Sequence, residues 1–454
     1  MAIYLSHLST SRPRIDELRI LLTLAVPILI AQLAQTSMGF VDTLMAAQVG
    51  AEDLAAVSLG SSIWLPIMLS LGGILMATTP QVAQLAGADQ EELTKKVFDQ
   101  AIFIALFCTV IATLILRNST PLLELMSITG TLQQKTDAYL KALSWGMPAI
   151  MVYQVCRSYC EGFGKTKPPM KIALLGLLCN IPLNYIFIYG KLGLPAFGGI
   201  GCGWATAIVM WIMVFCALLY FNTASQFHKF RLFRQLQPPS LPEIIIFLRL
   251  GLPIGFTLLV EVSMFCIIAL LVARLGDTVI AAHQITLSVS GLVFMFPLSI
   301  AMALTIRVGQ LVGSGAKNQA RFSTTTGLYF TTSCAVISCT LLTLFAAQIT
   351  TVYTDSPSII KLASGLLLIA AIFQIPDAIQ TASAGALRGY KDTAIPLCLV
   401  FIAFWLIALP IGYLLALTNV LLPAIGAAGF WYSLVIGLTI GAILLVTRLH
   451  FISR

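Results

Sequence analysis

The sequence predicts an all-α polytopic membrane protein with twelve transmembrane helices in two parallel six-helix lobes. Of its 454 residues, 58% are hydrophobic and only 10% are charged, and the mean hydropathy is +0.95. A soluble domain carries about 25% charged residues, and a disordered chain needs low hydrophobicity with high charge. Apolar runs long enough to cross a bilayer recur along the chain, and its first half resembles its second. The composition therefore excludes a soluble protein and leaves no room for a sizeable soluble domain.

Six apolar runs fill the first half of the chain, and each ends at charged, polar or Gly/Pro-rich residues. A transmembrane helix needs roughly 20 apolar residues. The first run begins after the charged segment 12–19 and ends before Gly50, and the third lies between Lys96 and Arg117. The predicted spans are 20–47, 54–80, 97–116, 139–161, 168–190 and 199–222.

Six further apolar runs follow a basic connecting segment. They predict spans at 244–273, 279–306, 323–349, 358–387, 394–418 and 424–447. We therefore expect an amino-terminal six-helix lobe over 1–222, a cytoplasmic inter-lobe linker over 223–243 and a carboxy-terminal six-helix lobe over 244–454.

The two halves align when the chain is shifted so that Pro27 falls on Pro253. The same shift pairs Gly50 with Gly276, Gln84 with Gln310 and Gly87 with Gly313. Because six spans return the chain to its starting side, both halves enter the membrane in the same orientation. Transporters built from such parallel repeats bind their substrate near the midplane between the halves and alternate access by rocking. Segments 83–87 and 309–315 join spans, and we expect both to be tight turns.

Lysine and arginine are distributed unequally between the two sides of the membrane. If the amino terminus is cytoplasmic, 19 of these residues fall on inner segments and six on outer segments. Cytoplasmic segments of membrane proteins carry the excess of basic residues, so we expect both termini in the cytoplasm. The net charge of +8 is scattered singly along the chain, and no nucleic-acid partner is expected.

Three carboxylates fall inside the predicted spans and away from the span ends: Asp42, Glu261 and Asp377. Glu261 and Asp377 lie close to the predicted midplane, and Asp42 lies nearer the outer surface. A charged side chain at the bilayer centre costs at least about 2.5–3.5 kcal/mol and marks a functional site by default. No mid-span lysine or arginine is predicted to pair with these acids. Each is therefore a candidate site for a proton, a sodium ion or a substrate cation.

Polar side chains near these acids are candidates for the lining of a binding site. Asn180 and Asn184 are four residues apart and share one helix face, so they are expected to lie beside Asp42. Their alternative role is to form hydrogen bonds that hold spans together. Gln35 aligns with Glu261 in the repeat, and Gln284 begins the eighth span. Both are included as further polar lining.

Several motifs together resemble a known family. They are Gly39-Phe-Val-Asp42-Thr43, Asn180-Ile-Pro-Leu-Asn184, Gly199-Ile-Gly201, Ala281-Ala-His-Gln284 and Leu387-Arg388-Gly389. Over essentially its whole length, the chain resembles the NorM branch of the multidrug and toxic compound extrusion (MATE) transporters.

The resemblance implies export of cationic amphipathic drugs and dyes, driven by inward flow of Na⁺ or H⁺ across a bacterial inner membrane. It implies that Asp42 is the amino-lobe acid and that Glu261 with Asp377 forms the carboxy-lobe cation site, where Na⁺ is a candidate metal. Asp355 resembles an outer-loop acid that faces the substrate in some members. No cofactor is implied, and a monomer in the lipid bilayer is expected, with organic cations as its small-molecule partners.

Two alternatives remain open. A flippase for lipid-linked saccharides shares this architecture, but it needs buried cations to hold a pyrophosphate head group. A polytopic membrane enzyme acting on lipids needs a His/Asp or metal cluster at one surface, whereas the four histidines are spread over both sides of the membrane. The chain carries no H-E-x-x-H, G-x-S-x-G or P-loop motif, so an enzyme is not expected.

Overall fold

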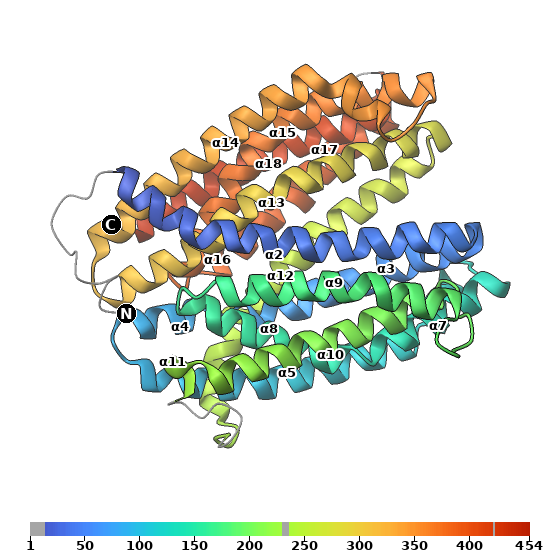
Figure 1. Cartoon of the computed structure of the whole chain (residues 1–454). Helices are drawn as coiled ribbons and strands as arrows, with labels where there is room; N and C mark the ends of the chain where they lie inside the picture. Colours follow the sequence, from blue (N-terminus) through green and yellow to red (C-terminus); the bar gives the residue numbers. More distant parts are fainter. Residues whose placement is uncertain (1–13, 229–235, 421–422) are drawn as a thin grey trace.

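The computed structural model describes residues 14–228, 236–420 and 423–454, and within these ranges it contains helices and no strands (Figure 1). A chain that crosses hydrocarbon must satisfy its backbone hydrogen-bonding groups internally, which helices do within a single segment. The predicted all-α membrane fold is confirmed.

The first half of the chain forms ten elements. They are α2 (Arg14–Val49), α3 (Ala51–Leu75), α4 (Thr78–Gly87), the 3₁₀ turn η1 (Glu91–Leu93), α5 (Thr94–Arg117), α6 (Thr120–Leu125), α7 (Gly130–Ser144), α8 (Met147–Gly162), α9 (Lys167–Tyr189) and α10 (Ile200–Thr223). A short helix, α11 (Ser225–His228), begins the connection to the second half.

The second half contains longer helices. They are α12 (Leu241–Ala273), α13 (Asp277–Gly313), α14 (Lys317–Thr351), α15 (Pro357–Gly389), α16 (Ala394–Phe401), α17 (Leu409–Leu417) and α18 (Ala427–Ile452). A π-helical stretch, η2 (Ile402–Ala408), joins α16 to α17, so these three elements form one continuous span.

Eleven helical segments in the described residues are long and apolar enough to cross a membrane, close to the twelve expected from the sequence. The predicted span 139–161 is the difference. It is occupied by α7 and α8, two shorter helices separated at Trp145 and Gly146, and neither is long enough alone.

The helices of the two halves lie on opposite sides of the molecule, with α2 between them (Figure 1). Helix α2 packs on α9 of its own half and on α13 of the other, and α12 packs on α3. Helix association within a bilayer depends on close van der Waals packing. Each half has such a core, centred on Tyr139, Tyr153 and Tyr159 in the first and on Phe430 and Trp431 in the second.

The two halves approach each other most closely where α4 crosses α13. The backbone of Gln310 leaves no room for a Cβ atom at Gly87, and the backbone of Gln84 leaves none at Gly313. The Gln84 side chain donates to the Gly389 carbonyl oxygen at 2.9 Å, and the Gln310 side chain donates to the Gly162 carbonyl oxygen at 3.2 Å. We call this end of the molecule, where α2 also begins, the closed end.

The expectation of tight turns at 83–87 and 309–315 was therefore wrong for most of both segments. Residues 83–87 belong to α4, and α13 continues to Gly313. The glycines are needed here because two helix backbones come into contact, which a side chain would prevent.

A buried ion pair also joins the two halves at the closed end. Arg307 of α13 donates from Nε and Nη2 to the two carboxylate oxygens of Glu17 on α2, at 2.7 and 3.0 Å. The Arg307 side chain is 9% exposed and the Glu17 side chain 3%. Leu21, Leu24 and Ile28 continue the same face of α2 and pack against the second half.

Candidate functional site

Asp42 lies buried on α2 within a cradle of polar side chains. Its Oδ1 atom accepts hydrogen bonds from Asn180 Nδ2 at 3.1 Å and from Asn184 Nδ2 at 2.6 Å, both on α9. Its Oδ2 atom accepts one from the Thr206 hydroxyl on α10 at 2.8 Å. Donors on two other helices, α9 and α10, therefore converge on the carboxylate of α2.

The pattern of donors fits an ionised carboxylate, which only accepts hydrogen bonds. Asn184 also donates to Asn180 Oδ1 at 3.1 Å, while its own Oδ1 atom is buried and has no partner in the described structure. If the Asn184 amide rotates by half a turn, that oxygen replaces the nitrogen beside Asp42 and can accept an O–H from the protonated carboxyl group. The arrangement provides acceptors and donors for both protonation states.

Thr206 was not identified from the sequence. A hydroxyl within an apolar run often donates only to the carbonyl oxygen one turn earlier, as Thr223 of α10 does at 2.9 Å. What distinguishes Thr206 is that α10 packs on α9, which brings this hydroxyl to Asp42 on α2, and this is a tertiary relationship. The glycine-rich start of α10 is the nearest signal in the sequence, because Gly201 packs directly on the α9 backbone.

Asp377 and Glu261 form a second acidic site in the other half. Asp377 on α15 is 8% exposed, and Glu261 on α12 is partly buried. Neither forms a hydrogen bond or ion pair with another residue in the described ranges. The two carboxylates are close enough to interact electrostatically, and Arg388 in the last turn of α15 interacts in the same way with Glu261.

Two glutamines on the Asp377 side of α15 add unpaired polar atoms to this half. Gln374 and Gln380 are three residues before and after Asp377, so they lie near it on the helix surface. Gln374 Nε2 and Gln380 Oε1 are buried without a partner in the described structure. Carboxylate and amide oxygens are the ligands that hard cations prefer. The two carboxylates and Gln380 Oε1 are such ligands, whereas Gln374 Nε2 is a hydrogen-bond donor and is not.

His283 lies buried near this site, although the sequence places it next to the loop. Its Nδ1 atom accepts a hydrogen bond from the Trp431 indole at 3.2 Å, so the ring proton is on Nε2. The Trp431 ring also meets the edge of Phe373, one turn before Asp377, with ring centroids 5.6 Å apart. His283 therefore packs in the aromatic layer beside the acidic site.

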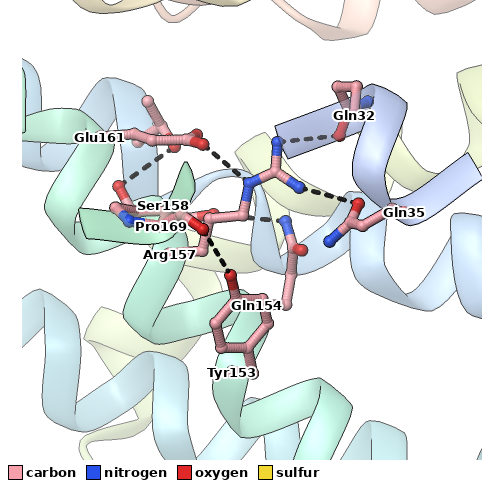
Figure 2. A network of polar contacts seen from close by, with 9 residues as sticks. Gln32, Gln35, Tyr153, Gln154, Arg157, Ser158, Glu161 and Pro169 are labelled. Atoms are coloured by element: carbon pink, nitrogen blue, oxygen red, sulfur yellow. Dashed lines mark hydrogen bonds and ion pairs between the residues drawn. The ribbon is translucent and has the colours of Figure 1, made fainter. Parts of the chain in front are cut away.

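Gln35 belongs to a separate polar network, which Figure 2 shows. Arg157 on α8 donates to Glu161 Oε1 at 2.7 Å, to Gln35 Oε1 at 3.3 Å and to Gln32 Oε1 at 3.0 Å. Arg157 and Glu161 are both buried, and their opposite charges compensate each other. They lie in the same half of the chain as Asp42. This pair was not identified from the sequence, although the four-residue spacing of Arg157 and Glu161 is a signal that could have found it.

Gln284 and Asp355 are not drawn into either acidic site. Gln284 is exposed on α13, and Asp355 is exposed in the connection between α14 and α15. Within the described ranges, neither side chain contacts an acid of the two sites. The structure therefore divides the predicted site residues into the Asp42 cradle, the Glu261 and Asp377 pair, the Arg157 network that includes Gln35, and two peripheral residues.

Comparison with known proteins identifies relatives along the whole chain. The sequence model of the MatE family matches residues 27–186 and again residues 253–414. The two matches begin at Pro27 and at Pro253, the pair that the internal repeat aligns.

The multidrug resistance protein MdtK of Pectobacterium atrosepticum is 45% identical over 441 residues, which cover 97% of this chain and 96% of that protein. The protein of the same name from Yersinia pestis (strain Pestoides F) is 44% identical over the same length and the same shares.

Two solved structures share the fold. A multidrug resistance MATE family transporter of the MOP superfamily in an outward-facing conformation has a TM-score of 0.87 and 21% identity, over 98% of this chain and all of that one. The eukaryotic MATE transporter AtDTX14 also has a TM-score of 0.87, with 18% identity over 96% of each chain.

Proposed function

Because this chain belongs to the MATE family of transporters, we propose that it is a secondary active multidrug efflux transporter, exporting cationic amphipathic compounds in exchange for Na⁺ or H⁺. The observation that carries the proposal is Asp42, a buried carboxylate that accepts three hydrogen bonds from neutral donors. No Lys or Arg in the described structure forms an ion pair with it. Its charge is therefore free to attract a cation.

The two acidic sites have different surroundings, which supports a division of roles. Asp42 has a full set of donors, whereas Glu261 and Asp377 have carboxylate neighbours and unpaired amides. Two nearby carboxylates repel each other, and a bound proton or sodium ion relieves that repulsion. We assign ion coupling to Glu261 and Asp377, and exchange between a proton and the organic cation to Asp42.

Alternating access requires that the two halves separate at one end while they close at the other. The crossing of α4 and α13, the two glutamine hydrogen bonds and the Glu17–Arg307 ion pair all hold the closed end together. We propose that residues 1–222 and 244–454 are the two moving lobes and that these contacts break when the transporter opens to the closed-end side.

The remaining assignments follow from the same chemistry. We propose a multi-pass protein of the bacterial inner membrane with both termini cytoplasmic, acting as a monomer without a cofactor. This orientation makes the closed end cytoplasmic, since most of the basic residues lie there. A lipid-linked saccharide flippase is disfavoured, because the buried Arg157 and Arg307 are each paired with a glutamate and the charge of Arg388 is attracted by Glu261.

Transport by the purified chain in vesicles tests the proposal. An imposed sodium gradient and an imposed proton gradient are applied separately, with a cationic dye as the substrate. We expect Asp377→Asn and Glu261→Gln each to abolish concentrative efflux while leaving expression and membrane insertion intact, because removing the charge removes the ion-dependent free energy. Glu92→Gln, an exposed acid at the closed end, is the matched control. Wild-type efflux by both site variants would contradict the assignment.

A further inference from the structure

An open groove of about 500 Å³ runs along the outer side of α2 at the closed end. Its lining residues are Ile15, Leu18, Arg19, Leu22, Thr23, Val26, Pro27 and Lys167. Seven of them come from the first four turns of α2, and Lys167 begins α9. The groove is therefore a feature of the helix surface that faces away from the second half.

The helical spacing separates this surface from the buried face of α2. Leu18, Leu22 and Val26 recur every four residues, so they form one row along the helix. Leu21, Leu24 and Ile28 lie on the other face, in the core shared with α13. Val26 is 46% exposed and Ile15 is 72% exposed. This part of α2 thus has one face against the second half of the chain and one apolar face that is partly exposed.

Two cations, Arg19 and Lys167, line the groove. Arg19 and Lys167 are exposed, and neither forms an ion pair with another described residue. The apolar row continues from Arg19 to Val26, seven residues further along α2, which corresponds to about 10 Å at the rise of an α-helix. The groove therefore combines two unpaired positive charges with a continuous apolar strip beside them.

We propose that this groove binds one anionic phospholipid, with the phosphate of its head group between Arg19 and Lys167 and an acyl chain along Leu18, Leu22 and Val26. Basic pockets at the ends of transmembrane helices recognise anionic head groups, and the surrounding bilayer supplies such a ligand. A soluble phosphate matches only the two cations, whereas an anionic lipid matches both the charges and the apolar strip.

The site has a structural consequence because the same turns of α2 carry the contact between the halves. Glu17, which pairs with Arg307, lies two residues before Arg19. A lipid that holds the outer face of this segment favours the position in which its inner face is docked. We therefore expect anionic lipid to stabilise the closed end, and this lipid site is independent of the identity of the transported compound.

Native mass spectrometry of the full-length chain, titrated with phosphatidylglycerol in detergent, measures the binding directly. We expect Arg19→Gln/Lys167→Gln to weaken the binding of the tightest lipid about 30-fold, roughly fivefold for each cation. Lys96→Gln/Lys317→Gln removes the same charge from exposed positions at the same end and is expected to stay within twofold of wild type. Equal affinity in the groove variant and this control would overturn the proposal.

Two further variants separate the parts of the site. Val26→Trp leaves both cations in place and fills the apolar strip, so it is expected to weaken lipid binding at least fivefold. Arg19→Lys/Lys167→Arg preserves both charges and is expected to bind within threefold of wild type, which controls for disturbance of the fold. Inorganic phosphate at the lipid concentration is expected not to compete. Full competition by phosphate, or unchanged binding by Val26→Trp, would show that no lipid chain occupies the groove.

Discussion

Gly87 packs its α-carbon directly on the backbone of Gln310, and the repeat places Gly313 against the backbone of Gln84 in the same way. The two contacts are equivalent in the internal repeat, so one sequence feature provides both sides of the crossing. The side chains of the same two glutamines then donate across to the opposite half. The closed end is thus built from two copies of a single contact.

Adding one methyl group at this crossing is expected to prevent closure. In Gly87→Ala and Gly313→Ala the new Cβ meets rigid backbone, which cannot rotate away as a side chain can. We expect each variant to lose most transport and to shift the population towards the state that is open at this end, measured by distances between spin labels on α4 and α13. Gly291→Ala, on the same helix α13 with free space around it, is the control. Normal transport and closed-state distances in both variants would show that the crossing does not control access.

The Glu17–Arg307 ion pair yields a prediction about stability. Removing one partner of a buried pair leaves an uncompensated charge, at a cost of about 3–5 kcal/mol, while replacing both with apolar residues is often neutral. We expect Arg307→Met to lower the free energy of unfolding by that amount, measured by denaturation in detergent, and Glu17→Leu/Arg307→Met to recover most of it. Lys141→Ala, which breaks the more exposed pair with Asp137, is expected to change it by less than about 1 kcal/mol. An equal loss in the single and double variants would show that the loss comes from the absence of the pair and not from an uncompensated Glu17 charge.

The membrane class, the spans and the repeat could be predicted because they depend on local composition and on spacing along the chain. The grouping of Asn180 with Asn184 followed from helical periodicity, and the structure places both beside Asp42. Thr206 required knowledge of which helices are neighbours. The spacing of residues along one helix does not show which other helices lie beside it.

The glycines of the closed end show a different limit. A glycine within an apolar pattern marks either a turn or a close approach of two backbones, and the sequence alone did not separate these possibilities. Gln84 and Gly87 were therefore interpreted as a turn. The distinguishing fact is that Gln310 and Gly313 pack against them, a contact between residues in opposite halves of the chain.

Membrane orientation is a prediction that labelling can test. Lys165 and Lys191 are both exposed and lie at opposite ends of α9, beyond its first and last residues. In a background without the ten native cysteines, we expect Lys165→Cys to react with a membrane-impermeant thiol reagent only from the cytoplasmic side, and Lys191→Cys only from the outside. Arg231, another predicted cytoplasmic position, lies outside the described residues. Reaction of position 191 from the inside would reverse the predicted orientation.

Asp42 is expected to exchange a proton for the organic cation, and proton release on substrate binding measures this exchange. Its three donors stabilise the ionised form, and rotation of the Asn184 amide would turn its unpaired Oδ1 towards Asp42 to accept the O–H of the protonated form. A permanently charged cation that binds near the carboxylate favours the ionised form, so binding releases protons from those molecules in which Asp42 is protonated, and reciprocity requires that protonation weaken substrate binding by the same factor. We expect purified protein in weakly buffered detergent solution to release protons when a quaternary ammonium dye is added, and Asp42→Asn to release fewer.

Asp16→Asn, which changes an exposed acid on the same helix, is expected to match the wild type. Equal release by wild type and Asp42→Asn would assign the titrating group elsewhere, and Asp42 would then serve as a fixed charge for the substrate, with Glu261 and Asp377 as the remaining carboxylates able to carry the proton.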